Sequence, residues 1–122
     1  MFNSDLNNAL TRANSSLIAG YAMPSDIYDK LTLGASDAEY TAPANGYFVF
    51  AKTATAAGQY IGLVCSSNGL YTLIRATGST GISCFLPVKK GDKIFAGYSA
   101  AGSLIQFRFI YAQGSESEAN NV

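Results

Sequence analysis

Few residues of this chain are of the types that carry out acid–base or metal chemistry. The sequence has no His, which removes the commonest general base and the commonest metal ligand. Two carboxylate pairs remain, Asp26 with Asp29 and Glu116 with Glu118. Such pairs can serve a glycosidase or hold calcium, but solvated loop carboxylates are far more common. We therefore expect no enzymatic activity, no catalytic residues, no metal site and no cofactor.

The two cysteines, Cys65 and Cys84, each lie in an apolar run, residues 61–65 (IGLVC) and 82–86 (ISCFL). Neither belongs to a CxxC pair, and two cysteines are too few for a disulfide scaffold. One interpretation is that both are buried free thiols, which act as small hydrophobic side chains. The other is a disulfide between neighbouring strands. The apolar surroundings favour the free thiols.

The charged residues and glycines do not indicate phosphate or nucleic-acid binding. No glycine-rich stretch ends in the GK[ST] of a phosphate-binding loop. Lys89 and Lys90 form a basic step at a turn, too short for a nucleic-acid patch. Eight basic residues balance eight acidic ones, so the chain has no general attraction to nucleic acid or anionic membranes. A neutral chain also repels its own copies weakly, which suits assembly.

Tyrosine is the remaining residue type that could form a site. Exposed Tyr side chains make good recognition surfaces, including for sugars, because the ring stacks and the hydroxyl forms hydrogen bonds. Most of the eight should fill the core or an interface. They are Tyr21, Tyr28, Tyr40, Tyr47, Tyr60, Tyr71, Tyr98 and Tyr111.

The length and composition fit one folded domain. The chain has 122 residues, of which 48% are hydrophobic and 13% charged, so it can build a core. The first five residues (MFNSD) do not resemble a signal peptide, and no apolar run approaches the roughly 18 residues of a membrane span. We expect a soluble protein that is made in the cytoplasm and does not insert into membranes.

Turn signals divide most of the chain into about eight short strands. Gly, Pro and Asn gather in residues 43–46, 66–69 and 87–92, which are predicted turns. Short strands at nearly regular spacing predict an all-β sandwich or barrel, and we expect an antiparallel, jelly-roll-like sandwich over residues 24–113. The expected strands are 31–33, 39–41, 47–50, 59–65, 70–75, 82–86, 93–98 and 104–112.

The last expected strand has two different faces. One face should be the core and holds Ile105, Phe107, Phe109 and Tyr111. The other face mixes apolar and polar residues, as subunit interfaces do. This candidate interface holds Leu104, Gln106, Arg108 and Ile110. A charge buried alone is costly, so we expect Arg108 to have a carboxylate or carbonyl partner.

Residues 1–23 differ in character from the strands and form an expected N-terminal attachment segment. Its apolar residues, spaced four, three and four apart, predict a helical stripe of less than two heptads, too short for an isolated coiled coil. The candidate anchor consists of Leu6, Leu10, Ala13 and Leu17. The stripe must dock on its own domain, on sister copies or on a larger particle. Pro24 ends any helix near Met23, and residues 114–122 form a polar tail.

Three motifs resemble the distal domains of phage tail fibres and related appendages: residues 40–48 (YTAPANGYF), 85–92 (FLPVKKGD) and 107–111 (FRFIY). In that group a similar first turn opens a core strand, the second turn precedes the penultimate strand, and an aromatic strand closes the sheet. The pattern is also similar to the wider jelly-roll group of complement-like and tumour-necrosis-factor-like trimers.

The resemblance implies a homotrimeric virion protein of a bacteriophage, a short fibre or appendage on tail or capsid. Such a protein serves host attachment or particle decoration. The implied partners are two further copies, other virion structural proteins, and a host cell-surface glycan or protein. The alternative is a non-phage, trimeric, cytokine-like or lectin-like binding domain. The lack of a signal peptide counts against a secreted cytokine-like ligand.

Overall fold

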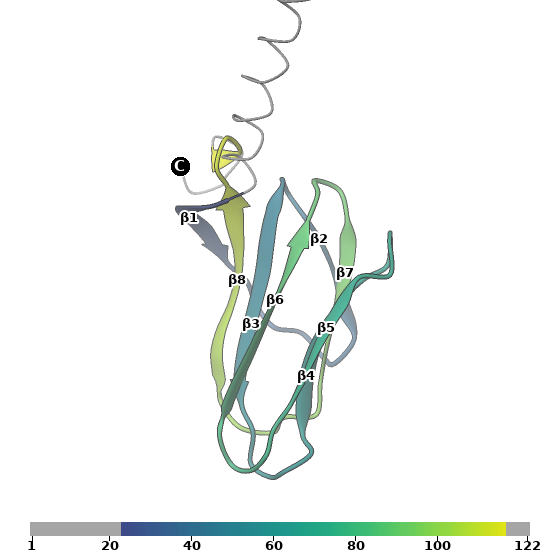
Figure 1. Cartoon of the computed structure of the whole chain (residues 1–122), viewed down its shortest axis with the longest axis vertical. Coiled ribbons are helices and arrows are strands. Elements are labelled where there is room, and N and C mark those ends of the chain that lie inside the picture. The colour runs from purple at the N-terminus through teal and green to yellow at the C-terminus, as the bar shows by residue number, and fades with distance from the viewer. Residues whose placement is uncertain (1–22, 117–122) are drawn as a thin grey trace, which may run out of the picture.

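The structure, a computed structural model, describes residues 23–116, which form two four-stranded antiparallel sheets (Figure 1). The strands are β1 (Pro24–Lys30), β2 (Ala38–Thr41), β3 (Gly46–Thr53), β4 (Tyr60–Cys65), β5 (Tyr71–Arg75), β6 (Gly81–Val88), β7 (Lys93–Tyr98) and β8 (Leu104–Ala112). A search of the described residues for a helix with the length and hydropathy to span a membrane finds none.

The strand order is that of an eight-stranded jelly roll. One sheet has the order β1-β8-β3-β6 and the other has the order β2-β7-β4-β5. In Figure 1 the first sheet lies on the left, and β4, β5 and β7 lie on the right. The expected all-β, jelly-roll-like sandwich is thereby confirmed.

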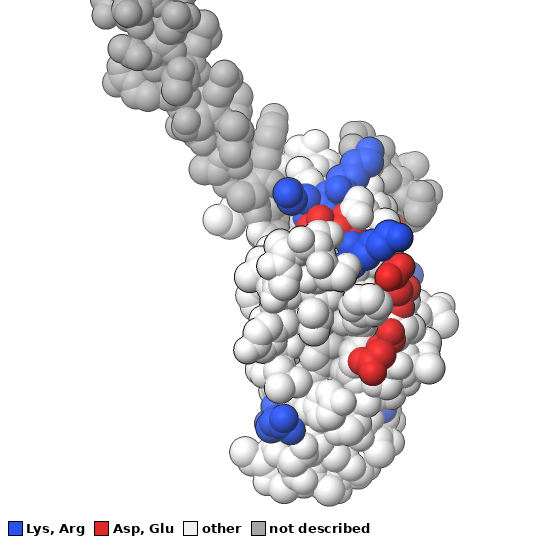
Figure 2. Space-filling model, turned by 90° about the vertical axis from the view of Figure 1, so that its right-hand side faces the viewer, with Lys and Arg blue, Asp and Glu red and all other residues white. Residues whose placement is uncertain are grey.

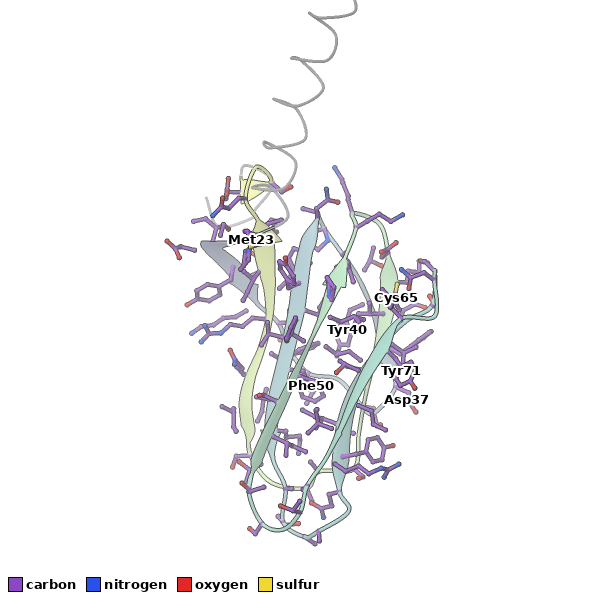
Figure 3. The ribbon with its side chains drawn as sticks, in the orientation of Figure 1. Met23, Asp37, Tyr40, Phe50, Cys65 and Tyr71 are labelled. Atoms are coloured by element: carbon purple, nitrogen blue, oxygen red, sulfur yellow. The ribbon has the colours of Figure 1, made fainter. Side chains whose placement is uncertain are left out.

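The core lies between the two sheets and is rich in aromatic rings. Each strand turns alternate side chains into this core. Strand β6 shows this most clearly, because exposed and buried residues alternate along its whole length. Phe48 and Phe109 meet edge to face with ring centroids 5.1 Å apart, and Phe109 meets Tyr111 in the same way at 5.0 Å. Phe50, fully buried, lies between the sheets (Figure 3). Each ring pair adds about 0.5–1.5 kcal/mol beyond the burial of its area.

The first strand differs from the expected one. Residues 31–33 are not a strand, and β1 lies at Pro24–Lys30 instead. Strand β1 is a half-exposed edge strand that contains Asp26 and Asp29, and Asp is a residue type depleted in strands. Its sequence therefore lacks the apolar alternation that marks the other strands.

Two further expectations at strand ends were wrong. Strand β6 continues through Pro87, which was expected in a turn. Proline is tolerated there because β6 is an edge strand and does not need every N–H. Ile105 was expected in the core but is 56% exposed, because the register between β3 and β8 shifts between Ala51 and Lys52. The other three expected core residues of β8 are buried.

Cys65 and Cys84 are both buried and free, which confirms their interpretation as buried thiols. They lie on β4 and β6, and therefore in different sheets. Burial raises the pKa of the Cys84 thiol to about 12.

Strand β1 begins at Pro24 and β8 ends at Ala112, inside the expected domain of residues 24–113. The division into segments 1–23, 24–113 and 114–122 stays a prediction. The helical stripe falls outside the described residues; it comprises Leu6, Leu10, Ala13 and Leu17.

Candidate interaction surfaces

The turn motifs at residues 40–48 and 85–92 meet at one end of the sandwich and form hydrogen bonds with one another. The N–H of Ala42 donates to the carbonyl of Asp92 at 2.8 Å. The side-chain oxygen of Asn45 accepts from the N–H of Lys90 at 2.9 Å. The carboxylate of Asp92, which is 7% exposed, accepts from the N–H of Lys89 at 2.9 Å. These polar side chains therefore stabilise the turns.

The two carboxylates of the pair that the structure describes in full, Asp26 and Asp29, have different surroundings. Asp29 accepts a hydrogen bond from the hydroxyl of buried Tyr111 at 2.5 Å, whereas Asp26 is exposed. Glu116 accepts from the N–H of Gly114, and Glu118 lies outside the described residues. Residues 23–116 hold no group of three or more His, Cys, Asp or Glu side chains that could bind a metal.

Lys52 is a buried charge that the sequence analysis did not single out. Its side chain is 8% exposed, and its ammonium donates to the carbonyls of Ala100 at 2.6 Å and Gly102 at 2.7 Å. The ammonium also lies 5.2 Å from the centroid of the Tyr98 ring. Lys52 thus ties β3 to the loop before β8. The sequence did contain a signal for the burial of Lys52, because the alternation along β3 places Lys52 on the same face as Phe50.

The outward side of the β1-β8-β3-β6 sheet carries a broad apolar surface, which we name the Phe85 face. Phe85 is 62% exposed, pairs across the strands with Val49, and has its ring centroid 6.4 Å from that of Tyr47. A shallow groove of about 570 Å³ lies on this face. It is lined by Pro24, Tyr47, Val49, Ser83, Cys84, Phe85, Gln106 and Ile110.

Most of the candidate interface residues of β8 lie on the Phe85 face. Ile110 pairs with Tyr47, Arg108 pairs with Val49, and Gln106 follows in the same alternation. Leu104, 42% exposed, lies beyond the register shift and is out of phase with them. The structure brings three of the four together.

Arg108 has an aromatic partner. Its guanidinium lies 4.4 Å from the centroid of the Tyr28 ring on the neighbouring edge strand. Such a cation–π contact contributes about 0.5–1 kcal/mol at an exposed site. The expected carboxylate or carbonyl partner stays a prediction for the assembled protein.

The outward side of the β2-β7-β4-β5 sheet carries a smaller hollow of about 210 Å³, which we name the glycine groove. Gly62 on β4 lies opposite Gly97 on β7, so two adjacent outward positions lack side chains. On one side, Val64 of β4 is flanked by Phe95 and Tyr71 in a single row across three strands. The hollow is lined by Asp37, Tyr60, Gly62, Val64, Tyr71, Thr72, Leu73, Phe95 and Gly97.

Asp37 closes one end of the glycine groove. Its backbone is left-handed, with a φ of 71°, a conformation that Asp tolerates better than most residues. Its carboxylate lies over Gly97, where an added Cβ would approach Oδ1 to 2.7 Å. In Figure 3, Asp37 and Tyr71 lie on the right-hand side of the molecule, away from Phe50 in the core. Figure 2 views this side, where uncharged residues cover most of the face, acidic groups lie on its right half and most basic groups lie in its upper part.

Tyr60 and Tyr71 were two of eight candidate tyrosines, but the sequence did not predict the groove. Its walls and floor come from β4, β5, β7 and the turn before β2, and only the register between strands brings them together. Asp37, Gly62 and Gly97 were missed for the same reason.

Comparison with known proteins gives similarity of fold. No protein-family model matches the chain, and no curated protein sequence matches it. The C-terminal domain of A223, a structural protein of Sulfolobus turreted icosahedral virus, has a TM-score of 0.42 at 20% identity, over 71% of this chain and 99% of that chain.

Two other solved structures are similar to the chain in fold. Pika GITRL has a TM-score of 0.38 at 11% identity, over 69% of this chain and 76% of its own. A carbohydrate-binding module of Cellvibrio mixtus lichenase 5A, solved with cellotriose, has a TM-score of 0.37 at 11% identity, over 78% and 93%. A shared fold does not fix function, so the function of this chain must be argued from its own surfaces.

Proposed function

We propose that this chain is a structural protein of a bacteriophage particle, a short homotrimeric appendage of tail or capsid that assembles through the Phe85 face. The observation that carries the proposal is the exposure of this face. A contiguous apolar patch on a soluble domain marks a contact surface. Its aromatic and arginine side chains, such as Tyr47, Phe85 and Arg108, are the types that interfaces favour.

The copy number of three follows from the resemblance of the turn motifs to phage appendages. Closed cyclic symmetry presents the same surface of every copy to its neighbour. The zero net charge of the chain keeps repulsion between copies weak. The proposed partner on the Phe85 face is therefore another copy of this chain.

Replacement of Phe85 by Asp tests this assembly. Because Phe85 is 62% exposed in the single chain, Phe85→Asp should leave the fold intact but place a charge inside the proposed interface. Light scattering should then report a monomer. Leu70→Asp, at a side chain 51% exposed and away from the Phe85 face, is the matched control and should remain trimeric. A trimer that survives Phe85→Asp would contradict the proposed interface.

Attachment to the particle is proposed to involve residues 1–23. A version that starts near Ala22 should fold and trimerise but should no longer join particles. Its melting, molar mass and incorporation into virions are the measurements. Failure to fold would show that the segment belongs to the domain. Normal incorporation would move the attachment elsewhere, for example to the tail after Gly114.

The alternative function is a trimeric, cytokine-like or lectin-like binding domain outside any virus. The glycine groove is the observation that favours a binding role, and such a role is compatible with either setting. Neighbouring genes distinguish the two: capsid or tail genes beside this one support the virion protein, and their absence supports the alternative.

A further inference from the structure

We infer that the glycine groove is a binding site for one ring of a neutral sugar. The inference goes beyond the virion proposal and does not depend on it, because the groove and the Phe85 face lie on different sheets. A trimer that buries the Phe85 face would leave the β2-β7-β4-β5 sheet for contacts with other molecules.

The shape of the groove suits a small flat ligand. Gly62 and Gly97 form its floor, and the row that contains Val64 forms one wall. Tyr60, two residues from Gly62 on the same face of β4, stands on the opposite side. A volume of about 210 Å³ is below the roughly 300 Å³ at which pockets for larger ligands begin, so it suits a single ring.

The aromatic lining suits the apolar face of a sugar. Tyr71 is 69% exposed and offers a ring together with a hydroxyl that can form hydrogen bonds. Phe95 and Tyr71 stand two strands apart, which corresponds to about 10 Å between their backbones. Within the described chain these rings and that of Tyr60 make no contact with one another. They are spread along the walls and do not close a cage around a single ammonium group.

The charges at the groove favour a neutral ligand, because an acidic and a basic group both lie there. The Arg75 guanidinium lies 5.7 Å from the centroid of the Tyr60 ring. Asp37 is the one charged residue among those described that line the groove. Its carboxylate has no hydrogen-bond or ion-pair partner within residues 23–116. It can accept hydrogen bonds from sugar hydroxyls, and it would repel an acidic sugar. The nearby carboxylate of Glu39 is instead 3.7 Å from the ammonium of Lys93.

Amide chemical-shift mapping on the full chain tests the inference. The probes are the methyl glycosides of glucose, galactose and mannose, with methyl glucuronide as an acidic sugar and choline as a cation. We expect at least one neutral glycoside to shift the amide signals of Gly62 and Gly97 saturably. Methyl glucuronide should bind at least about tenfold more weakly, a loss of about 1.4 kcal/mol.

Two variants at exposed groove positions assign the binding. Tyr71→Ala removes a wall, and Asp37→Asn removes the charge while keeping a residue that tolerates the left-handed backbone. Each should weaken the neutral glycoside about tenfold or more. Leu70→Ala, next to Tyr71 but not part of the lining, should bind as the unaltered chain does.

Three results would overturn the inference: no neutral glycoside shifts these signals, Tyr71→Ala binds unchanged, or choline binds in place of the sugars. The molar mass of the same samples is measured by light scattering. A monomer that still binds the glycoside would contradict the trimer and support the sugar site. A trimer that binds none would do the reverse.

Discussion

Cys84 shows how burial alone changes the chemistry of a residue. Its thiol pKa is raised from 9.0 to about 12, so between these values the unfolded chain loses the thiol proton while the folded chain retains it. The contribution of Cys84 to the free energy of unfolding should be constant below pH 9 and should decrease as the pH rises toward 12. The loss should reach up to about 1.4 kcal/mol per pH unit.

Urea unfolding of the chain and of Cys84→Ala at several pH values measures this contribution. Tyr and Lys side chains titrate in both proteins, so the difference between them isolates the thiol. That difference should shrink above pH 9. A difference that is the same at neutral and alkaline pH would show that the thiol is not shielded from water.

Lys52 is a structural charge, held by the backbone carbonyls of Ala100 and Gly102. Lys52→Met keeps the apolar stem but leaves both carbonyls without their donor. We expect the free energy of unfolding to decrease by about 1–3 kcal/mol. Lys93→Met, which breaks an exposed ion pair with Glu39, should cost less than about 1 kcal/mol. Equal losses in urea unfolding would contradict the role assigned to Lys52.

The packing of β3 on β8 leaves no room for a side chain at Gly46. A Cβ at this position would lie 2.2 Å from the carbonyl oxygen of Ile110 and 2.7 Å from the Phe109 ring. Gly46→Ala should therefore destabilise the domain by about 1–3 kcal/mol or more and lower its melting temperature. Gly78→Ala is the control, because its added Cβ meets nothing within 4 Å. If both variants melt alike, the close packing of β3 on β8 is wrong.

Local pattern predicts the elements of this fold well where apolar residues alternate. Strands β2 to β8 were expected near their observed positions, and the outward placement of Gln106, Arg108 and Ile110 on β8 follows from the same alternation. The pattern fails at β1, a polar edge strand, and at Ile105, where a register shift interrupts the alternation. The position of a strand at a sheet edge and a shift in its pairing both depend on the neighbouring strands, so the sequence of one strand shows neither.

The candidate sites depend on contacts between strands, and this limits what the sequence predicts. The Phe85 face was partly predicted, because β8 contributes a whole row to it. The glycine groove was not, because Asp37, Gly62 and Gly97 are far apart in sequence and become neighbours only through the pairing of β7 with β4 and the turn before β2. Composition indicated that tyrosines could form a site but not which ones.

At the scale of the whole molecule, the two sheets present outward surfaces with different chemistry. The Phe85 face is broad and apolar, and the glycine groove is small, with aromatic walls and one carboxylate. We assign assembly to the first surface and ligand binding to the second. Assembly is the central claim, because it determines which sheet stays exposed.

The molar mass of the unmodified chain at micromolar concentration tests that claim most directly. Sedimentation equilibrium should give about 38 kDa, three times the 12.8 kDa of one chain. The mass should stay constant as the protein is diluted through the micromolar range. A mass of 12.8 kDa throughout that range would rule out the proposed trimer, because the Phe85 face would then be exposed to water in the native protein.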